Sequence, residues 1–212
     1  MPESGLVQQI AQKGADHGEI ADEVIRRPEL LAEVLAGLAS DKARIKYGCD
    51  KVLRRISERK PEILYPEIDL FIKLINSEST FLKWGAIHIL ANLAAVDSDG
   101  KIEQTFDKYF SPVTGPVLIT AANIIKGAAV IALAKPDLTK RITAELLKVE
   151  SARYQTAECN NIALGHTIRS FDRFYLQIKN KEPVNGLVSR HLENTRNATR
   201  KAAERFVKKR LA

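Results

Sequence analysis

The sequence has few of the residues that build disulfide scaffolds, metal sites and catalytic centres. Its two cysteines, Cys49 and Cys159, lie far apart and outside any CxxC spacing, so neither a disulfide framework nor a zinc site is expected. The four histidines are scattered, and no HExxH, P-loop, GxGxxG or nucleophile-elbow motif occurs. These absences predict a non-enzymatic protein that has no cofactor, no metal site and no catalytic residues.

One apolar stretch, Gly115–Ala134, is long enough to cross a bilayer. It carries Lys126 near its centre, where a charge costs about 2.5–3.5 kcal/mol on insertion scales. We therefore expect a helix buried within the protein and no membrane span. Residues 1–14 have neither the basic nor the apolar region of a signal peptide, so a cytoplasmic location is predicted.

An acidic turn around Gly100 has part of the spacing of a calcium-binding EF-hand loop. With Gly100 at the glycine position of the loop, Asp97 and Asp99 occupy ligand positions, but the first ligand falls on Ala95 and the bidentate glutamate on Phe106. Because both ends of the loop are lost, we expect a polar turn in which Asp99 caps the next helix.

Nearly every segment repeats its apolar residues with the 3.6-residue period of an α-helix, and no convincing strand alternation occurs. A small residue followed a few positions later by aliphatic residues recurs along the chain. The lead residues of this pattern, which are separated by 37, 36, 36 and 45 positions, are Gly48, Gly85, Ala121, Ala157 and Ala202. A near-constant step of this size is typical of a pair of antiparallel helices per repeat.

The first helix of each pair is expected upstream of each lead residue. The predicted ranges are Pro28–Ala39, Pro66–Ile75, Lys101–Tyr109, Leu138–Val149 and Val184–Asn194. Residues 1–27 are expected to form one or two short capping helices, with Asp16 and Glu19 at the spacing of a capping box. Residues 28–212 are expected to form one solenoid domain.

This pattern resembles the HEAT-repeat family of α-solenoids over Pro28 to Leu211. That family tends to place a basic residue three positions before a small one at the start of the second helix. The matching pairs here are Lys46 with Cys49, Lys83 with Ala86 and Arg200 with Ala203. Units three and four depart from the pattern, with Ile119 and Gln155 at the basic position. Armadillo repeats add a third helix, for which a 36–37-residue step leaves little room.

The resemblance implies an all-α, right-handed α-α superhelix of about five HEAT-like helix pairs with N-terminal capping helices. A lone helix pair cannot cover its apolar face, so stacked pairs share one core. Such arrays expose a surface lined by the second helices, and this surface is where they bind partners.

The first functional hypothesis is a scaffold that binds a protein partner along the second-helix surface. Its candidate residues are Lys46, Lys83, Trp84 and His88, of which Trp84 and His88 share one helical face. The alternative for Trp84 and His88 is ordinary packing for the tryptophan and a solvent-facing position for the histidine.

The second hypothesis is nucleic-acid binding, because positive charge collects at the C-terminus. Residues 189–212 carry eight Lys or Arg against two Glu, within a chain of net charge +7. On the helix expected there, Lys201, Arg205 and Lys208 share a face that can contact phosphates, and the alternative is a solvated capping helix. The HEAT-like alkylpurine DNA glycosylases have a similar size and basic character, but no stretch here matches their aromatic and acidic motif. A second basic cluster comprises Lys51, Arg54, Arg55, Arg59 and Lys60.

Overall fold

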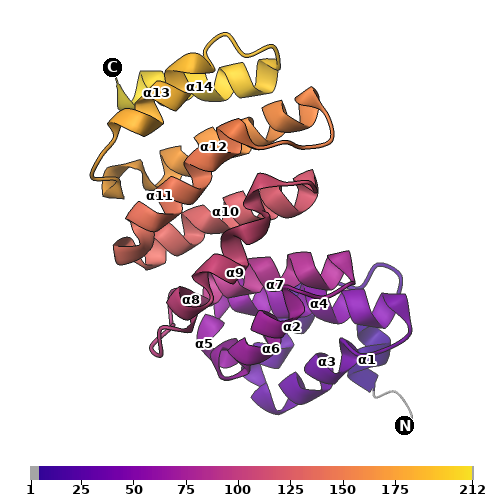
Figure 1. Ribbon diagram of the computed structural model, residues 1–212. Helices are drawn as coiled ribbons and strands as arrows, with labels where there is room; N and C mark the ends of the chain where they lie inside the picture. Colours follow the sequence, from indigo (N-terminus) through magenta and orange to yellow (C-terminus); the bar gives the residue numbers. More distant parts are fainter. Residues whose placement is uncertain (1–4, 212) are drawn as a thin grey trace. The chain divides into compact units, whose positions relative to one another are not determined.

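A computed structural model describes residues 5–211 (Figure 1). Fourteen α-helices and six short 3-10 helices lie within this range, and none of its residues forms a strand. The all-α class predicted from the hydropathy period is therefore confirmed. Between Asp99 and Gly100 the chain divides into two compact units, called unit 1 (residues 1–99) and unit 2 (residues 100–212). A single solenoid domain over residues 28–212 stays a prediction.

Unit 1 contains an N-terminal pair of short helices followed by two pairs whose second helices are long. In chain order its α-helices are α1 (Gly5–Ile10), α2 (His17–Arg26), α3 (Leu31–Gly37), α4 (Ala43–Arg59), α5 (Pro61–Leu64), α6 (Ile68–Leu74) and α7 (Thr80–Leu93). Helix α3 packs on α4, α6 packs on α7, and the second helices α4 and α7 pack on each other. The two helix pairs predicted for this unit are thus confirmed. The short α5 precedes the second pair and is an element that the repeat pattern did not predict.

The N-terminal helices cover one side of α4. Both α1 and α2 pack on α4, which confirms the predicted short helices for residues 5–26; residues 1–4 lie outside the described range. Asp16 caps α2, because its Oδ1 accepts hydrogen bonds from the N–H groups of Gly18 (2.8 Å) and Glu19 (3.1 Å). The capping position read from the sequence is therefore confirmed.

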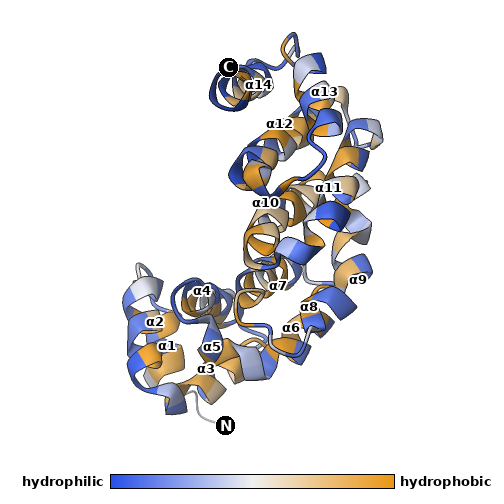
Figure 2. Ribbon diagram, turned by 90° about the vertical axis from the view of Figure 1, so that its left-hand side faces the viewer, coloured by the Kyte–Doolittle hydropathy of each residue, from blue (hydrophilic) through white to orange (hydrophobic). Residues whose placement is uncertain are grey.

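Unit 2 contains three helix pairs in two layers. Its α-helices are α8 (Lys101–Gln104), α9 (Phe106–Phe110), α10 (Leu118–Ala134), α11 (Thr139–Leu147), α12 (Ala157–Phe174), α13 (Glu182–Arg190) and α14 (Asn197–Arg210). The second helices stack in the order α10, α12, α14, while α11 and α13 form the other layer (Figure 2). All three predicted second helices of this unit are present, and α12 is the longest helix within residues 5–211.

Helix α10 is the apolar segment that raised the question of a membrane span. Most of its residues are buried inside unit 2, while Lys126 is exposed. Within residues 5–211, no helix is long and apolar enough to cross a membrane. The expectation of a helix buried in the protein is therefore confirmed.

The lead glycines allow neighbouring helices to approach closely. A Cβ at Gly48 would lie 2.5 Å from a methyl carbon of Ile10, and a Cβ at Gly85 would overlap the carboxylate of Asp50. In the fourth repeat the predicted lead residue, Ala157, is exposed at the start of α12. Gly165 makes the close approach instead, 2.7 Å from Thr199 Oγ1 when a Cβ is placed there. The repeat alignment was therefore wrong for this helix, because α12 begins earlier relative to its contact with α14.

Candidate functional site

The four candidate partner-binding residues lie on the second helices of unit 1. Lys46 belongs to α4, whereas Lys83, Trp84 and His88 belong to α7, and all four are half-buried. Trp84 and His88 face the same side of α7, one turn apart. Lys46 and Lys83 each precede an aromatic residue by one position, and successive side chains on a helix point about 100° apart, so the two lysines lie at the flank of that side.

Three aromatic rings join α4 and α7 at the surface. The centroids of Tyr47 and Phe81 are 4.8 Å apart, and those of Phe81 and Trp84 are 5.5 Å apart in an edge-on arrangement. Phe81 is 55% exposed, which is unusual for a large apolar side chain. Sequence analysis identified Trp84 but missed Phe81, although the i, i+3 spacing between the two residues indicated a shared helical face. We call Tyr47, Phe81 and Trp84 the aromatic cluster.

Two hollows lie on the side of α4 that carries Tyr47, where α4 faces the turn between α1 and α2. One, of about 530 Å³, is lined by Tyr47, His17, Arg44 and Lys51 among others. The other, of about 510 Å³, is lined by Lys51, Arg54 and Arg55 together with two carboxylates. Partial burial and then Lys51 lower the pKa of His17, so this histidine adds no charge at neutral pH. The surroundings of the aromatic cluster are therefore mainly cationic.

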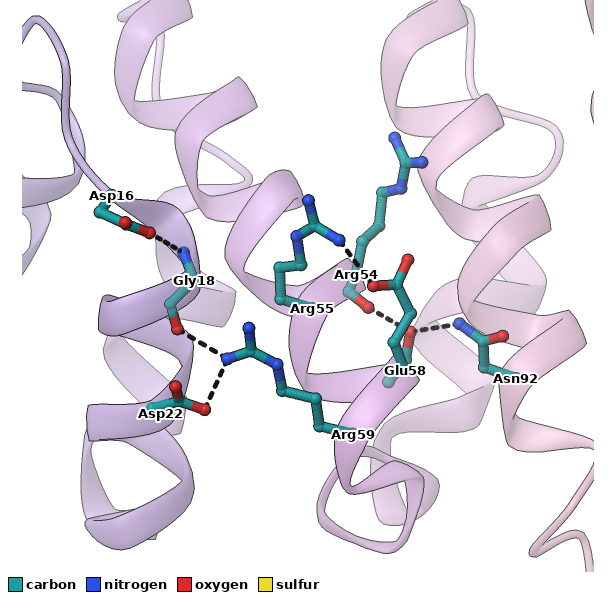
Figure 3. A network of polar contacts seen from close by, with 9 residues as sticks. Asp16, Gly18, Asp22, Arg54, Arg55, Glu58, Arg59 and Asn92 are labelled. Carbon is teal, nitrogen blue, oxygen red and sulfur yellow. Dashed lines mark hydrogen bonds and ion pairs between the residues drawn. The ribbon is translucent and has the colours of Figure 1, made fainter.

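Part of the second basic cluster is used within unit 1. Arg59 reaches from α4 to α2, where it donates to the carbonyl of Gly18 (2.8 Å) and to Asp22 (2.5 Å) (Figure 3). Arg55 pairs with Glu58 at 2.9 Å, and both side chains are about half exposed. Lys51 and Arg54 form no ion pair within the described part of the chain. These two cations are thus available on the second-helix surface.

Asp50 is a buried carboxyl group that sequence analysis did not single out. It is 8% exposed and lies where α4 meets Gly85 of α7. Burial raises the pKa of Asp50 to about 7, against the opposing effect of Arg54 and Lys51. The absence of a side chain at Gly85 leaves the space that the Asp50 carboxyl group occupies.

In unit 2, Lys201, Arg205 and Lys208 are exposed on α14, as the helical spacing predicted. Among the small and aliphatic residues of α14, Ala198 is exposed and Val207 is only half-buried. The residues that pack are Thr199, Ala202, Ala203 and Phe206. Thr199 donates to the Asn161 carbonyl (2.6 Å), and the Phe206 ring meets Tyr175 at 5.0 Å, and these contacts fix the rotation of the helix.

The other five C-terminal cations are held in ion pairs. The pairs are Arg190 with Glu150 (2.7 Å), Arg196 with Glu158 (2.7 Å), Arg200 with Glu204 (3.9 Å), and Lys209 and Arg210 with Asp172 (3.0 and 2.6 Å). Lys201, Arg205 and Lys208 have no ion pair among residues 5–211. The net positive charge of the C-terminus is therefore concentrated on the three residues that the helical spacing selected.

Helix α12 adds further cations beside α14. Arg169 Nη2 lies 3.3 Å from His166 Nδ1. Burial, followed by the charges of Arg169, Lys126 and Arg196, lowers the pKa of His166 to about 4. Burial and the neighbouring Arg196 and Arg205 also lower the pKa of Arg169. The second helices of unit 2 therefore gather positive charge beyond the C-terminal helix.

Comparisons with known proteins bear on the fold. No protein-family model matches the chain, and no curated protein matches its sequence. Solved structures match over nearly the whole chain. A designed armadillo repeat protein, YIII(Dq)4CqI, has a TM-score of 0.58 and 16% identity, covering 96% of this chain and 89% of its own. A second design, YIII(Dq.V1)4CPAF in complex with the peptide (KR)4, has a TM-score of 0.59 and 14% identity, covering 95% and 89%. The chain is an α-solenoid.

These matches establish repeat stacking of the armadillo or HEAT kind without separating the two types. An engineered protein with a TM-score of 0.55 and 14% identity, covering 96% of this chain and 86% of its own, has the same fold. At these identities the likeness concerns the fold alone. Membership of the HEAT family stays a prediction.

Polar contacts between repeats of the solenoid recur at one repeat length. Arg190 and Glu150 are 40 residues apart, and Arg210 and Asp172 are 38 apart. In unit 1, Arg59 and Asp22 are 37 apart. The sequence could therefore have indicated these ion pairs, because each joins an acidic and a basic residue about one repeat length apart.

Within residues 5–211, the two thiols and the acidic groups show no metal-binding geometry. Among the described residues, no group of three or more His, Cys, Asp or Glu side chains could hold a metal ion. Cys49 is buried, and burial raises its pKa to about 12, whereas Cys159 is half-exposed at the start of α12.

The acidic turn before Gly100, which has part of the spacing of a calcium loop, is tied to Tyr65. The Tyr65 hydroxyl donates to Asp97 Oδ1 (2.9 Å) and accepts from the Asp99 N–H (3.0 Å).

Proposed function

We propose that the chain is a non-enzymatic, HEAT-like interaction module of the cytoplasm. Its second-helix surface in unit 1 binds an extended protein segment that carries acidic and apolar side chains. The observation that supports this most directly is the aromatic cluster, in which Phe81 is 55% exposed. Exposed aromatic groups next to polar residues are typical anchors of protein interfaces.

The charges around the aromatic cluster favour an acidic partner. Lys51 and Arg54 have no ion pair within residues 5–211, and Arg44 lines the adjacent hollow with Tyr47. Lys46 and Lys83 lie at the flank of the same surface. Charge complementarity steers an acidic segment to this surface, while an aliphatic or aromatic side chain of the segment packs on Phe81. The armadillo design in complex with (KR)4 binds a basic peptide, whose charge is opposite to that of the acidic segment proposed here.

The test is selection of random 12-residue peptides displayed on phage against the full chain. Peptides rich in Asp or Glu with at least one large apolar residue should be enriched. Binding of the selected peptides should weaken at least tenfold in the double variant Phe81→Ala, Lys51→Glu, because it removes one anchor and one complementary charge.

The matched control is the double variant Leu176→Ala, Lys140→Glu in unit 2. Leu176 is 80% exposed and Lys140 is exposed, so the control removes the same kinds of group elsewhere. Circular dichroism checks that both variants remain folded. Equal retention of the selected peptides by both double variants would overturn the proposal, as would enrichment of basic peptides.

A further inference from the structure

The second helices of unit 2 carry positive charge that no acidic residue balances. Their acidic residues are Glu158, Asp172 and Glu204, and each is already in an ion pair, with Arg196 just before α14 or with a cation of α14. Helix α10 contains no Asp or Glu. Six cations of these helices are exposed and have no ion pair within the described chain: Lys126, Arg169, Arg173, Lys201, Arg205 and Lys208. We call these six residues the cationic band.

The cationic band crosses three neighbouring helices. Helix α12 packs on both α10 and α14, and packed helices lie about 8–10 Å apart. The Arg169 guanidinium lies beside Gly165, where α12 meets Thr199 of α14, and 3.3 Å from His166. After burial, the charge of Lys126 on α10 contributes to the lowered pKa of His166, and that of Arg205 on α14 to the lowered pKa of Arg169. Arg173 lies one turn from Arg169, and Lys201 and Lys208 lie one turn to either side of Arg205.

One member of the band is held in place by its neighbour. His166 is uncharged at neutral pH, so its Nδ1 accepts a hydrogen bond from Arg169 Nη2 at 3.3 Å. The guanidinium group keeps its other donors for a ligand. An arginine fixed in this way suits a phosphate or carboxylate oxygen, which accepts paired N–H donors.

The surface around the band offers charge but no stacking groups. The aromatic residues of α10, α12 and α14 are Phe171, Phe174 and Phe206, and all three are buried. Proteins that bind unpaired bases stack them on exposed aromatic rings, and protein interfaces use apolar anchors near their centre. The exposed apolar residues of α10, Ile119 and Leu133, lie at its two ends.

We propose that the cationic band binds the phosphate backbone of a nucleic-acid duplex without reading its bases. Contacts of this kind depend on charge and position and carry no sequence information. This site is separate from the peptide-binding surface proposed for unit 1, so either proposal can fail without the other.

The test is fluorescence anisotropy with the full chain and four labelled probes in 25–300 mM NaCl. The probes are a 24-base-pair DNA duplex, the same duplex as RNA, a 24-nucleotide single strand and a 24-residue polyglutamate. With about six phosphates contacted, affinity for a duplex should fall about 10³-fold between 50 and 200 mM salt. The DNA and RNA arms identify which duplex is preferred.

The deciding variant is Arg169→Gln, Arg205→Gln, and its control is Lys140→Gln, Lys179→Gln. Both remove two positive charges from exposed positions of unit 2, but the control residues lie outside the band. The band variant should bind a duplex at least tenfold more weakly at 100 mM NaCl and should lower the salt slope by about two. The control should keep the affinity within about twofold.

Four results would overturn the proposal. The first is absence of duplex binding at 25 mM NaCl, and the second is an equal loss in both variants, which would reflect net charge alone. The third is tighter binding of polyglutamate than of either duplex, which would assign the band to an acidic protein. The fourth is tighter binding of the single strand than of the duplex. Circular dichroism of both variants excludes unfolding as the cause of any loss.

Discussion

In unit 1 the carboxyl group of Asp50 is buried where α4 meets α7, whereas in unit 2 the carboxylate of Asp172 joins α12 to α14 at the surface. Burial raises the pKa of Asp50 to about 7. Partial burial also acts to raise the pKa of Asp172, but Lys209 and Arg210 outweigh it and hold the pKa below its ordinary value. The same junction between second helices is thus made once by a buried carboxyl group with a raised pKa and once by an ion pair.

The exposed sides of these helices differ in a parallel way. Unit 1 presents the aromatic cluster, with Phe81 at its centre. Unit 2 presents the cationic band, and all the aromatic residues of its second helices are buried. A repeated backbone therefore leaves the chemistry of each surface to a few outward-facing residues, and for this reason we propose a different partner for each unit.

The largest expected effect is the pH dependence that Asp50 imposes on stability. Its pKa is higher in the folded than in the unfolded chain, so the folded state gains stability at low pH and loses it as pH rises through about 7. Between pH 5 and pH 8, the free energy of unfolding of the native chain should fall by on the order of 3 kcal/mol relative to Asp50→Asn. Urea titration at both pH values measures this, and parallel pH profiles would contradict it.

The next effect concerns the glycines at the two junctions. Gly85→Ala should lower the free energy of unfolding by about 1–3 kcal/mol, because the added methyl group overlaps the Asp50 carboxylate. Gly165→Ala should cost less, because its methyl group would lie 2.7 Å from the single hydroxyl of Thr199. Asp50→Ala should restore much of the stability lost in Gly85→Ala.

The control for both glycine variants is Gly186→Ala on α13. There an added Cβ meets only the flexible end of the Arg190 side chain, at 3.2 Å. Thermal and urea unfolding should leave this variant near the native stability. Failure of Asp50→Ala to rescue Gly85→Ala would show that another neighbour sets the cost.

A smaller effect with the opposite sign is expected at Asp172. Because its pKa is lower in the folded chain, its contribution is present above the ordinary pKa of an aspartate and is lost as pH falls through the folded value. Asp172→Asn should cost about 1 kcal/mol at pH 7, since Asp172 and Lys209 are partly exposed to water. The cost should shrink toward pH 3 in urea titrations, opposite to the trend at Asp50.

The smallest effect is a change in the titration of two histidines. Burial is the main cause that lowers the pKa of both histidines; the charges of Arg169, Lys126 and Arg196 follow at His166, whose pKa is about 4, and that of Lys51 follows at His17. In NMR titrations, Arg169→Gln should raise the pKa of His166, and Lys51→Gln should raise that of His17. An unchanged pKa of His166 in Arg169→Gln would contradict the effect of the Arg169 charge on this histidine.

The helix pairs could be predicted from the sequence because their apolar period is local. The apolar pattern of each second helix is complete within about fifteen residues, as in α7 around Gly85 and Leu90. The environment of Asp50 could not be predicted in the same way, because it depends on a missing side chain at Gly85 in the next repeat. Next to Cys49 and Lys51, Asp50 reads as an ordinary polar position.

The surfaces were predictable only in part. Lys201, Arg205 and Lys208 were selected by helical spacing, and the structure places them on one exposed face. They lack ion pairs because the nearby acids, Glu158 and Asp172, bind other cations. Each of these acids lies one repeat upstream of the cation that it binds. Arg169 joins the band because α12 packs beside α14, which a local pattern does not reveal.

The two thiols make the chain easy to label at one position. Only the thiolate form of cysteine reacts quickly with maleimides, and Cys49 is buried with a pKa raised to about 12. Cys159 is half-exposed at the start of α12, in the unit that carries the cationic band. A fluorophore attached to Cys159, without any mutation, would report on ligands that bind unit 2, while unit 1 would carry no label.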